Sequence, residues 1–182
     1  MKNKKLLIAI LCIFVFDLPG AANRIRQNFD FDWQFRLGEN GDFREVQLPH
    51  DWSVELDFDE KAGGASGYLP GGIGWYRKSF MIPASYKNQK VSLVFDGIYH
   101  KATIFLNGKE IAYHRYGYTS FETDLTPFLK YGESNDLKIK VDHSEISRWY
   151  TGSGIYRHVW LQVTNPVHVK MWGTYAVSYT HL

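Results

Sequence analysis

Three consecutive side chains that can hold a polar ligand lie directly before a glycine-rich turn. Arg148, Trp149 and Tyr150 precede Thr-Gly-Ser-Gly at 151–154, and the chain then continues as IYRHVWLQV. A guanidinium donates paired hydrogen bonds, while Trp and Tyr combine an apolar face with a polar edge. Two glycines within three residues favour backbone at positive φ or in tight contact with a neighbour. The pattern predicts a functional loop that is held at the mouth of a strand.

Two other clusters contain groups that can transfer protons. Asp57, Asp59 and Glu60 form a carboxylate cluster, and His50 precedes Asp51. Carboxylates of this kind usually belong to a solvated loop, and no motif supplies a serine or cysteine nucleophile for the histidine. We expect the first cluster to be a solvated loop face and the second to be a polar support for its loop.

The histidines do not indicate a metal site. They stand at positions 50, 100, 114, 143, 158, 168 and 181. No HxxxH pair and no His/Asp cluster occurs among them, and these are the spacings that zinc sites use. We therefore expect no metal and no cofactor.

Residues 1–22 have the composition of a secretory signal peptide. Lysines at 2, 4 and 5 precede an apolar stretch over residues 6–16, and Gly-Ala-Ala at 20–22 offers small side chains for cleavage. The apolar stretch is short for a membrane span, which takes about 20 residues. A membrane anchor or a buried helix is the alternative. We expect a periplasmic or extracellular protein that has no membrane span after cleavage.

The part that remains after cleavage is neutral and contains no cysteine. Removing residues 1–22 takes three lysines and one aspartate from 21 basic and 19 acidic side chains, and it removes the single cysteine. A neutral surface gives no electrostatic reason to expect a nucleic acid partner. Stability must come from core packing instead of disulfides. The remaining length suits one domain, residues 23–176.

Short segments of alternating apolar residues follow one another along this domain. The segments that predict strands are 29–37, 74–82, 90–98, 101–116, 136–143, 155–164 and 166–177. Asn107-Gly108 predicts a tight hairpin, residues 58–74 predict a long glycine-rich loop, and residues 124–132 predict one helical turn. No long amphipathic helix is predicted. Many short strands with regular turns favour an all-β fold, an antiparallel β-sandwich.

Four motifs in order carry a family resemblance. LPHDW at 48–52, GWYRKSF at 74–80, the segment 95–129 and SRWYTGSGIYRHVWL at 147–161 resemble the N-terminal sugar-binding domain of glycoside hydrolase family 2. The resemblance covers residues 24–176 and is greatest to exported bacterial β-galactosidases. It implies a jelly-roll sandwich that is similar to galactose-binding domains. It also implies a carbohydrate substrate and downstream immunoglobulin-like and TIM-barrel domains in the same chain.

The resemblance also bears on catalysis and on the loop at 148–150. Two barrel carboxylates perform retaining hydrolysis in this family, and no acidic residue of this chain matches the catalytic motifs. Some members place a sugar-binding carboxylate where this chain has Arg148, and an amide where it has Gly71. A guanidinium is a donor, so the contact would be altered. We expect Arg148, Trp149 and Tyr150 to bind substrate; for the two aromatic residues, burial beneath the loop is the alternative.

Two further functional hypotheses compete with a family 2 hydrolase fragment. One is a free-standing carbohydrate-binding module, and the other is a structural β-sandwich between domains. Residues 177–182, VSYTHL, resemble a translated sequencing-adapter end and are expected to be non-native, with a natural C-terminus as the alternative. Sequencing the gene beyond Ala176 separates these hypotheses.

Overall fold

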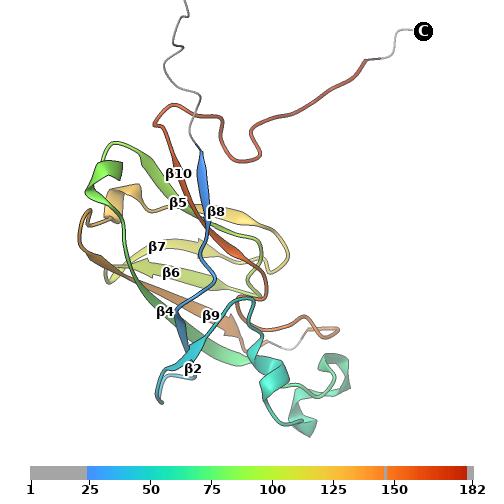
Figure 1. Cartoon of the computed structure of the whole chain (residues 1–182). Helices are drawn as coiled ribbons and strands as arrows, with labels where there is room; N and C mark the ends of the chain where they lie inside the picture. The colour runs from blue at the N-terminus through green and yellow to red at the C-terminus, as the bar shows by residue number, and fades with distance from the viewer. Residues whose placement is uncertain (1–23, 146, 180–182) are drawn as a thin grey trace, which may run out of the picture.

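The chain folds into two antiparallel β-sheets packed face to face, which confirms the predicted all-β sandwich (Figure 1). The computed structural model describes residues 24–145 and 147–179. The predicted signal peptide, residues 1–22, and positions 180–182 of the predicted tail lie outside the described residues. Across the described residues, no helix is long and apolar enough to cross a membrane.

The smaller sheet contains four strands and the larger sheet contains six. The smaller sheet has the order β1 (Ile25–Asn28), β10 (Val159–Thr164), β5 (Lys90–Phe95), β8 (Phe121–Asp124). The larger sheet has the order β3 (Arg44–Val46), β2 (Trp33–Leu37), β4 (Gly72–Met81), β9 (Ser134–His143), β6 (Ala102–Leu106), β7 (Lys109–His114). Within the described residues, five short 3-10 helices lie in the connections: η1 (Trp52–Glu55), η2 (Glu60–Ala62), η3 (Gly64–Ser66), η4 (Ala84–Tyr86) and η5 (Thr126–Phe128).

The core lies between the two sheets and follows the alternation of the sequence. Every second residue of a strand points to the same face, so Val159, Leu161 and Val163 of β10 are buried against the larger sheet. Neighbouring strands are paired so that their core-facing residues lie side by side: Ile139 on β9 pairs with Ile104 on β6. Both side chains are fully buried. The sandwich is therefore stabilised mainly by burial of aliphatic and aromatic side chains.

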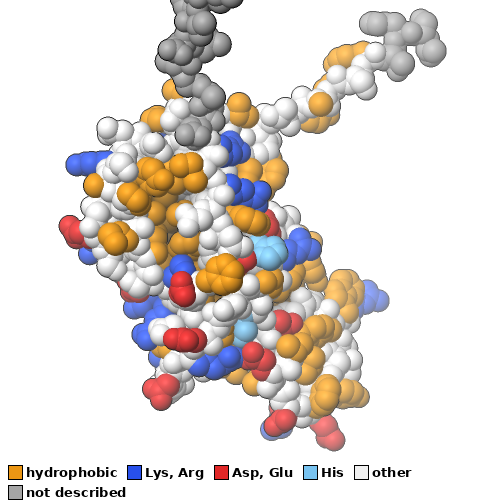
Figure 2. Space-filling model, viewed as in Figure 1, with side chains coloured by type: hydrophobic (Ala, Val, Ile, Leu, Met, Phe, Trp, Pro, Cys, Tyr) orange, Lys and Arg blue, Asp and Glu red, His pale blue; other side chains and the backbone are white. Residues whose placement is uncertain are grey.

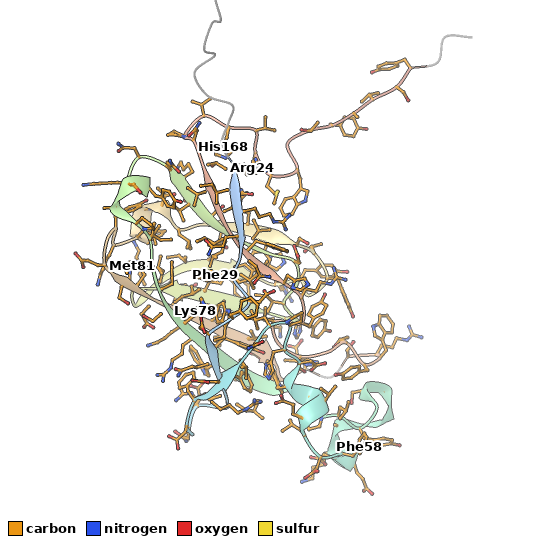
Figure 3. The ribbon with its side chains drawn as sticks, in the orientation of Figure 1. Arg24, Phe29, Phe58, Lys78, Met81 and His168 are labelled. Carbon is orange, nitrogen blue, oxygen red and sulfur yellow. The ribbon has the colours of Figure 1, made fainter. Side chains whose placement is uncertain are left out.

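One inward-facing position of β4 carries a lysine. Lys78 follows Tyr76 on the buried face, and its ammonium lies 4.6 Å from the centre of the Phe29 ring (Figure 3). The ammonium donates to the carbonyl of Phe31 and lies 4.0 Å from the carboxylate of Asp32. Burial lowers the pKa of Lys78. Contact with an aromatic face, a carbonyl and a carboxylate explains how the charge is accommodated at the edge of the core.

The single strand predicted over residues 29–37 is wrong, because the chain changes sheets there. β1 ends at Asn28 in the smaller sheet, and β2 begins at Trp33 in the larger sheet. Between them, the buried carboxylate of Asp30 accepts hydrogen bonds from the backbone N–H of Val159 and from the His158 ring. The Asp30 contacts replace strand pairing, and Phe31 is left 55% exposed.

The strand predicted over residues 166–177 is also wrong. This segment has no strand and leaves Val167, Val169 and Trp172 exposed. An alternating pattern forms a strand only when another strand pairs with it, and none of the described strands does. In Figure 1 the segment extends away from the sandwich, beside the point where β1 begins.

The predicted turns and loops are confirmed. Asn107 and Gly108 connect β6 to β7 with φ of +52° and +82°, as a tight hairpin requires. The predicted helical turn is η5, and it begins beside a proline. The long glycine-rich loop contains only η2 and η3 before β4 begins at Gly72. These features depend on residues that are adjacent in the sequence, which is why the local sequence predicts them.

Candidate functional site

Four loops meet at one end of the sandwich, which we call the loop end; its described residues are 49–71, 96–101, 115–120, 143–145 and 147–158. Tyr99 and Gly154 exchange two backbone hydrogen bonds of 2.9 Å, and the hydroxyl of Tyr156 donates to the carbonyl of Gly117 at 2.8 Å. Figure 1 shows the loop end opposite the end at which β1 begins and from which the segment after β10 leaves. Segments far apart in the sequence therefore form one surface.

Asp51 connects the loop around η1 to the glycine-rich turn. One carboxylate oxygen accepts from the backbone N–H of Ser53 at 3.0 Å and of Ser153 at 2.8 Å. The other oxygen accepts from the hydroxyl of Tyr150. Burial and the neighbouring carboxylate both raise the pKa of Tyr150, so this phenol remains a donor at neutral pH. Asp51 thereby fixes the positions of both loops.

The two glycines of the turn are required by its geometry, as the sequence predicted. Gly152 and Gly154 have φ of +75° and +99°, where residues with a side chain are strained. A Cβ atom at Gly154 would overlap the hydroxyl of Tyr76 and lie 2.9 Å from the Trp52 ring. The turn is thus packed against the core and holds the loop before it.

The three predicted binding residues lie together on the exposed side of this turn. Arg148 is exposed, and no hydrogen bond or ion pair of its guanidinium occurs within the described part of the chain. Trp149 is 57% exposed, and its indole N–H donates to the hydroxyl of Tyr118 at 3.1 Å. Tyr150 is 39% exposed and is held by Asp51. Neither aromatic ring is buried beneath the loop.

A shallow hollow of about 410 Å³ opens beside Tyr150. Its lining includes His50, Asp51, Gly152 and Tyr156. Further aromatic side chains stand exposed around the loop end, among them Phe58 at the tip of the protruding loop (Figure 3). Figure 2 shows hydrophobic and acidic side chains mixed over this part of the surface. Exposed aromatic groups at an open end are typical of a binding or docking surface.

His50 is a polar support, as the sequence predicted. It is 8% exposed, with Nδ1 2.7 Å from the hydroxyl of Tyr76 and Nε2 3.3 Å from the carboxylate of Glu55. Trp52 lies in the core and stacks on Phe35. Burial is the main cause that lowers the pKa of His50. The segment LPHDW therefore anchors the loop end to the core.

A buried chain of hydroxyls and a histidine was missed by the sequence interpretation. The Ser153 hydroxyl lies 2.6 Å from Nδ1 of His143 and 2.5 Å from the hydroxyl of Ser53. Ser53 lies 100 positions from Ser153, whereas His143 lies 10 positions from it. Only the glycine-rich turn indicated that Ser153 would be packed. All three are buried, and their hydrogen bonds stabilise the loop end.

The pH dependence of folding tests the burial of His143. Burial, together with the neighbouring His100, lowers its pKa to about 4, whereas an unfolded histidine titrates near 6.5. Between these values the folded state binds fewer protons, so stability is complete above pH 6.5 and is lost as the pH falls toward 4. We expect the urea midpoint to fall over this range, and His143→Gln to reduce the slope. His168→Gln, outside the loop end, is the control; an unchanged slope in the His143 variant would contradict the assignment.

The carboxylate cluster of the long loop is a solvated loop face, as predicted. Asp57, Asp59 and Glu60 are exposed, and Asp59 caps η2 by accepting from the backbone N–H of Lys61 at 2.9 Å. Within the described residues, no group of three or more His, Cys, Asp or Glu side chains is arranged to hold a metal ion. The exposed aromatic side chains Tyr68, Trp149 and Tyr150 are among the groups that the loop end offers to a polar ligand.

Comparison with known proteins places this geometry in a family context. The family model for the sugar-binding domain of glycosyl hydrolases family 2 matches residues 67–166. A β-galactosidase of Bacteroides ovatus is 44% identical in an alignment over 169 residues that covers 85% of this chain and 20% of that protein. A β-glucuronidase of Bacteroides fragilis is 32% identical in an alignment over 172 residues that covers 90% of this chain and 24% of that protein.

Solved structures agree with these matches. A member of the family from Bacteroides cellulosilyticus aligns with a TM-score of 0.75 at 40% identity, covering 81% of this chain and 21% of the other. A β-glycosidase from Bacteroides vulgatus aligns with a TM-score of 0.75 at 42% identity, covering 80% of this chain and 21% of the other. The chain spans about a fifth of the length of these relatives.

Proposed function

The chain belongs to glycosyl hydrolase family 2, and from this premise we propose that it is the N-terminal part of an exported, retaining, β-galactosidase-like hydrolase. The relatives that it matches are about five times as long. The missing part would include the immunoglobulin-like and TIM-barrel domains that the resemblance implies. Its jelly-roll sandwich would support an active site that the barrel completes. The lysine-rich, apolar leader over residues 1–22 supports export.

In this proposal the loop end faces the sugar. The supporting observation is the position of Arg148, Trp149 and Tyr150 directly before a turn that is packed on the core, where Asp51 holds Tyr150. The guanidinium would donate to sugar hydroxyls or to a barrel carboxylate. Trp149 and Tyr150 would stack on apolar sugar faces. Cleavage itself would come from two barrel carboxyl groups about 5 to 5.5 Å apart.

Extending the gene and assaying both proteins tests the proposal. We expect an open reading frame beyond Ala176 that encodes a barrel, and turnover of nitrophenyl galactosides, glucuronides or mannosides only by the complete protein. The chain alone should give no turnover above a mock purification, because no motif in it supplies the paired carboxylates. A stop codon at this point would contradict the proposal and favour a binding module. Turnover by the chain alone, abolished by a mutation within it, would also overturn it.

A further inference from the structure

A second hollow of about 330 Å³ lies beside Trp149, on residues that the sequence interpretation did not select. It is lined by Tyr99, His100, Lys101, Arg115, Tyr116, Gly117, Tyr118 and Glu145, and we call it the Arg115 hollow. Its volume is within the range of small-ligand sites, about 300 to 1,000 Å³. It shares the loop end with the turn that presents Arg148.

The walls of the Arg115 hollow are aromatic and held in place. The Tyr118 ring lies 5.5 Å from the buried ring of Tyr99 and 5.7 Å from the ring of Tyr116, in edge-to-face contacts. The indole N–H of Trp149 donates a hydrogen bond of 3.1 Å to the hydroxyl of Tyr118 and so orients that ring. Tyr116 and Tyr118 are nevertheless 59% and 41% exposed. Oriented, exposed rings of this kind provide faces on which the C–H groups of a sugar can stack.

The backbone beneath these rings is preorganised. Gly117 is buried, and a Cβ atom there would overlap the Tyr99 ring. Its carbonyl accepts from the hydroxyl of Tyr156, and the carbonyl of Arg115 accepts from the backbone N–H of Lys101 at 3.2 Å. A ligand would therefore meet a formed site and would not have to order the loop.

The charge of the Arg115 hollow is positive. Lys101 is paired with Glu145, so these two charges compensate each other. The Arg115 side chain is exposed, and its guanidinium has no hydrogen bond or ion pair within residues 24–145 and 147–179. Burial and the nearby Lys101 lower the pKa of His100, which is therefore neutral at pH 7. The positive charge of Arg115 is therefore not compensated within the hollow. Its planar guanidinium donors fit two oxygens of an anionic group.

We propose that the Arg115 hollow binds an anionic sugar residue of the oligosaccharide substrate, a uronate or a sulfated sugar. Arg115 donates paired hydrogen bonds to the carboxylate or sulfate, while Tyr116 stacks on the ring. The inference rests on the proposed function for the carbohydrate nature of the substrate. It adds a site distinct from the Arg148 loop and a preference for acidic glycans.

Titration of the ¹⁵N-labelled full chain tests this site. The probes are D-glucuronate, D-galactose 6-sulfate, neutral D-galactose and acetate, and the readout is the Trp149 indole N–H peak, assigned with Trp149→Phe. We expect glucuronate or the sulfated sugar to move this peak and to bind about tenfold more tightly than galactose, as one charged hydrogen-bonding group would provide. Which of the two binds better identifies the anion.

Two exposed substitutions, each with a matched control, examine the contacts. Arg115→Gln should weaken binding about tenfold, whereas Lys87→Gln, at the exposed residue directly after η4, should not. Tyr116→Ala should weaken binding of the sugar more than of acetate, whereas Tyr113→Ala, exposed on β7, should not. Circular dichroism confirms that each variant is folded. Repeating the glucuronate titration on the complete enzyme shows whether the hollow stays open beside its neighbouring domains.

Four results would overturn the inference. Galactose that binds as tightly as glucuronate would remove the anionic preference. Acetate that binds as tightly would mean an anion site without sugar recognition. A Trp149 peak that no probe moves would mean that the hollow binds no sugar, and a peak that glucuronate moves only in the isolated chain would mean that another domain covers it. Each can occur in an enzyme whose barrel is active, so this inference and the proposed function can fail separately.

Discussion

Replacing Arg148 with alanine in the complete enzyme should lower kcat/KM by roughly 10- to 150-fold, because one charged hydrogen bond contributes about 1.5 to 3 kcal/mol. The guanidinium is exposed and has no partner within residues 24–145 and 147–179, so the substitution removes no contact that stabilises this domain. We therefore expect an unchanged melting temperature. Steady-state kinetics on a nitrophenyl glycoside, with a thermal melt of the same sample, measure both quantities.

Arg157→Ala is the matched control for this experiment. Arg157 is exposed on the same loop, after the turn, and its guanidinium lies 5.3 Å from the centre of the Tyr156 ring. We expect little change in kcat/KM for this variant. Equal kinetics for the Arg148 variant and the wild type would show that the loop does not handle substrate. A lower melting temperature without a selective kinetic loss would identify Arg148 as a structural clamp toward another domain.

Replacing Gly154 with alanine should destabilise the domain by roughly 2–5 kcal/mol, from backbone strain at φ +99° and overpacking of the core. The new methyl group would overlap the hydroxyl of Tyr76, which also accepts from the backbone N–H of Ile155 at 3.4 Å. Tyr76 and Trp52 are fully enclosed and have no space to move into. We expect the melting temperature to fall by roughly 5 to 20 °C, measured by calorimetry.

Gly108→Ala separates backbone strain from steric overlap. Gly108 also has positive φ, +82°, but nothing lies within 4 Å of a Cβ atom built there. Its substitution should destabilise by only about 1–2 kcal/mol. If both variants lose the same stability, the close packing of the turn on Tyr76 contributes nothing, and the glycine is required only for its backbone conformation.

Local patterns in the sequence were sufficient for most of the sandwich. The alternation in KVSLVF and DLKIKV identified the residues of β5 and β9 that face the core, because successive side chains of a strand point to opposite sides. It did not indicate that Ser92 and Val94, on the other face of β5, are buried too. Asn107-Gly108 identified the β6–β7 hairpin, because its turn needs two residues at positive φ. The paired glycines at 152 and 154 identified a constrained turn. Each feature is fixed by residues close together in the chain.

Alternation alone failed where long-range pairing decides the structure. Residues 29–37 alternate throughout, yet the contacts of buried Asp30 with Val159 and His158 interrupt them and move the chain to the other sheet. Residues 166–177 alternate equally well and form no strand. A periodic pattern describes which side chains can share a face, whereas strand formation also requires a neighbouring backbone to accept its hydrogen bonds.

The candidate site, like the fold, has features that the sequence predicts and features that only the tertiary structure decides. The sequence by itself determined the all-β class, the turn before β10 and the candidate residues Arg148, Trp149 and Tyr150. Only the tertiary structure decided that Asp51 holds Tyr150, that Tyr118 holds Trp149, and that Arg115 lies in a hollow beside them. Such contacts join residues about 30 to 100 positions apart, and they form only after strand pairing has brought four loops to one end. The types of side chain in a loop indicate what that loop can bind, and the pairing of the strands decides which loops lie together in one binding surface.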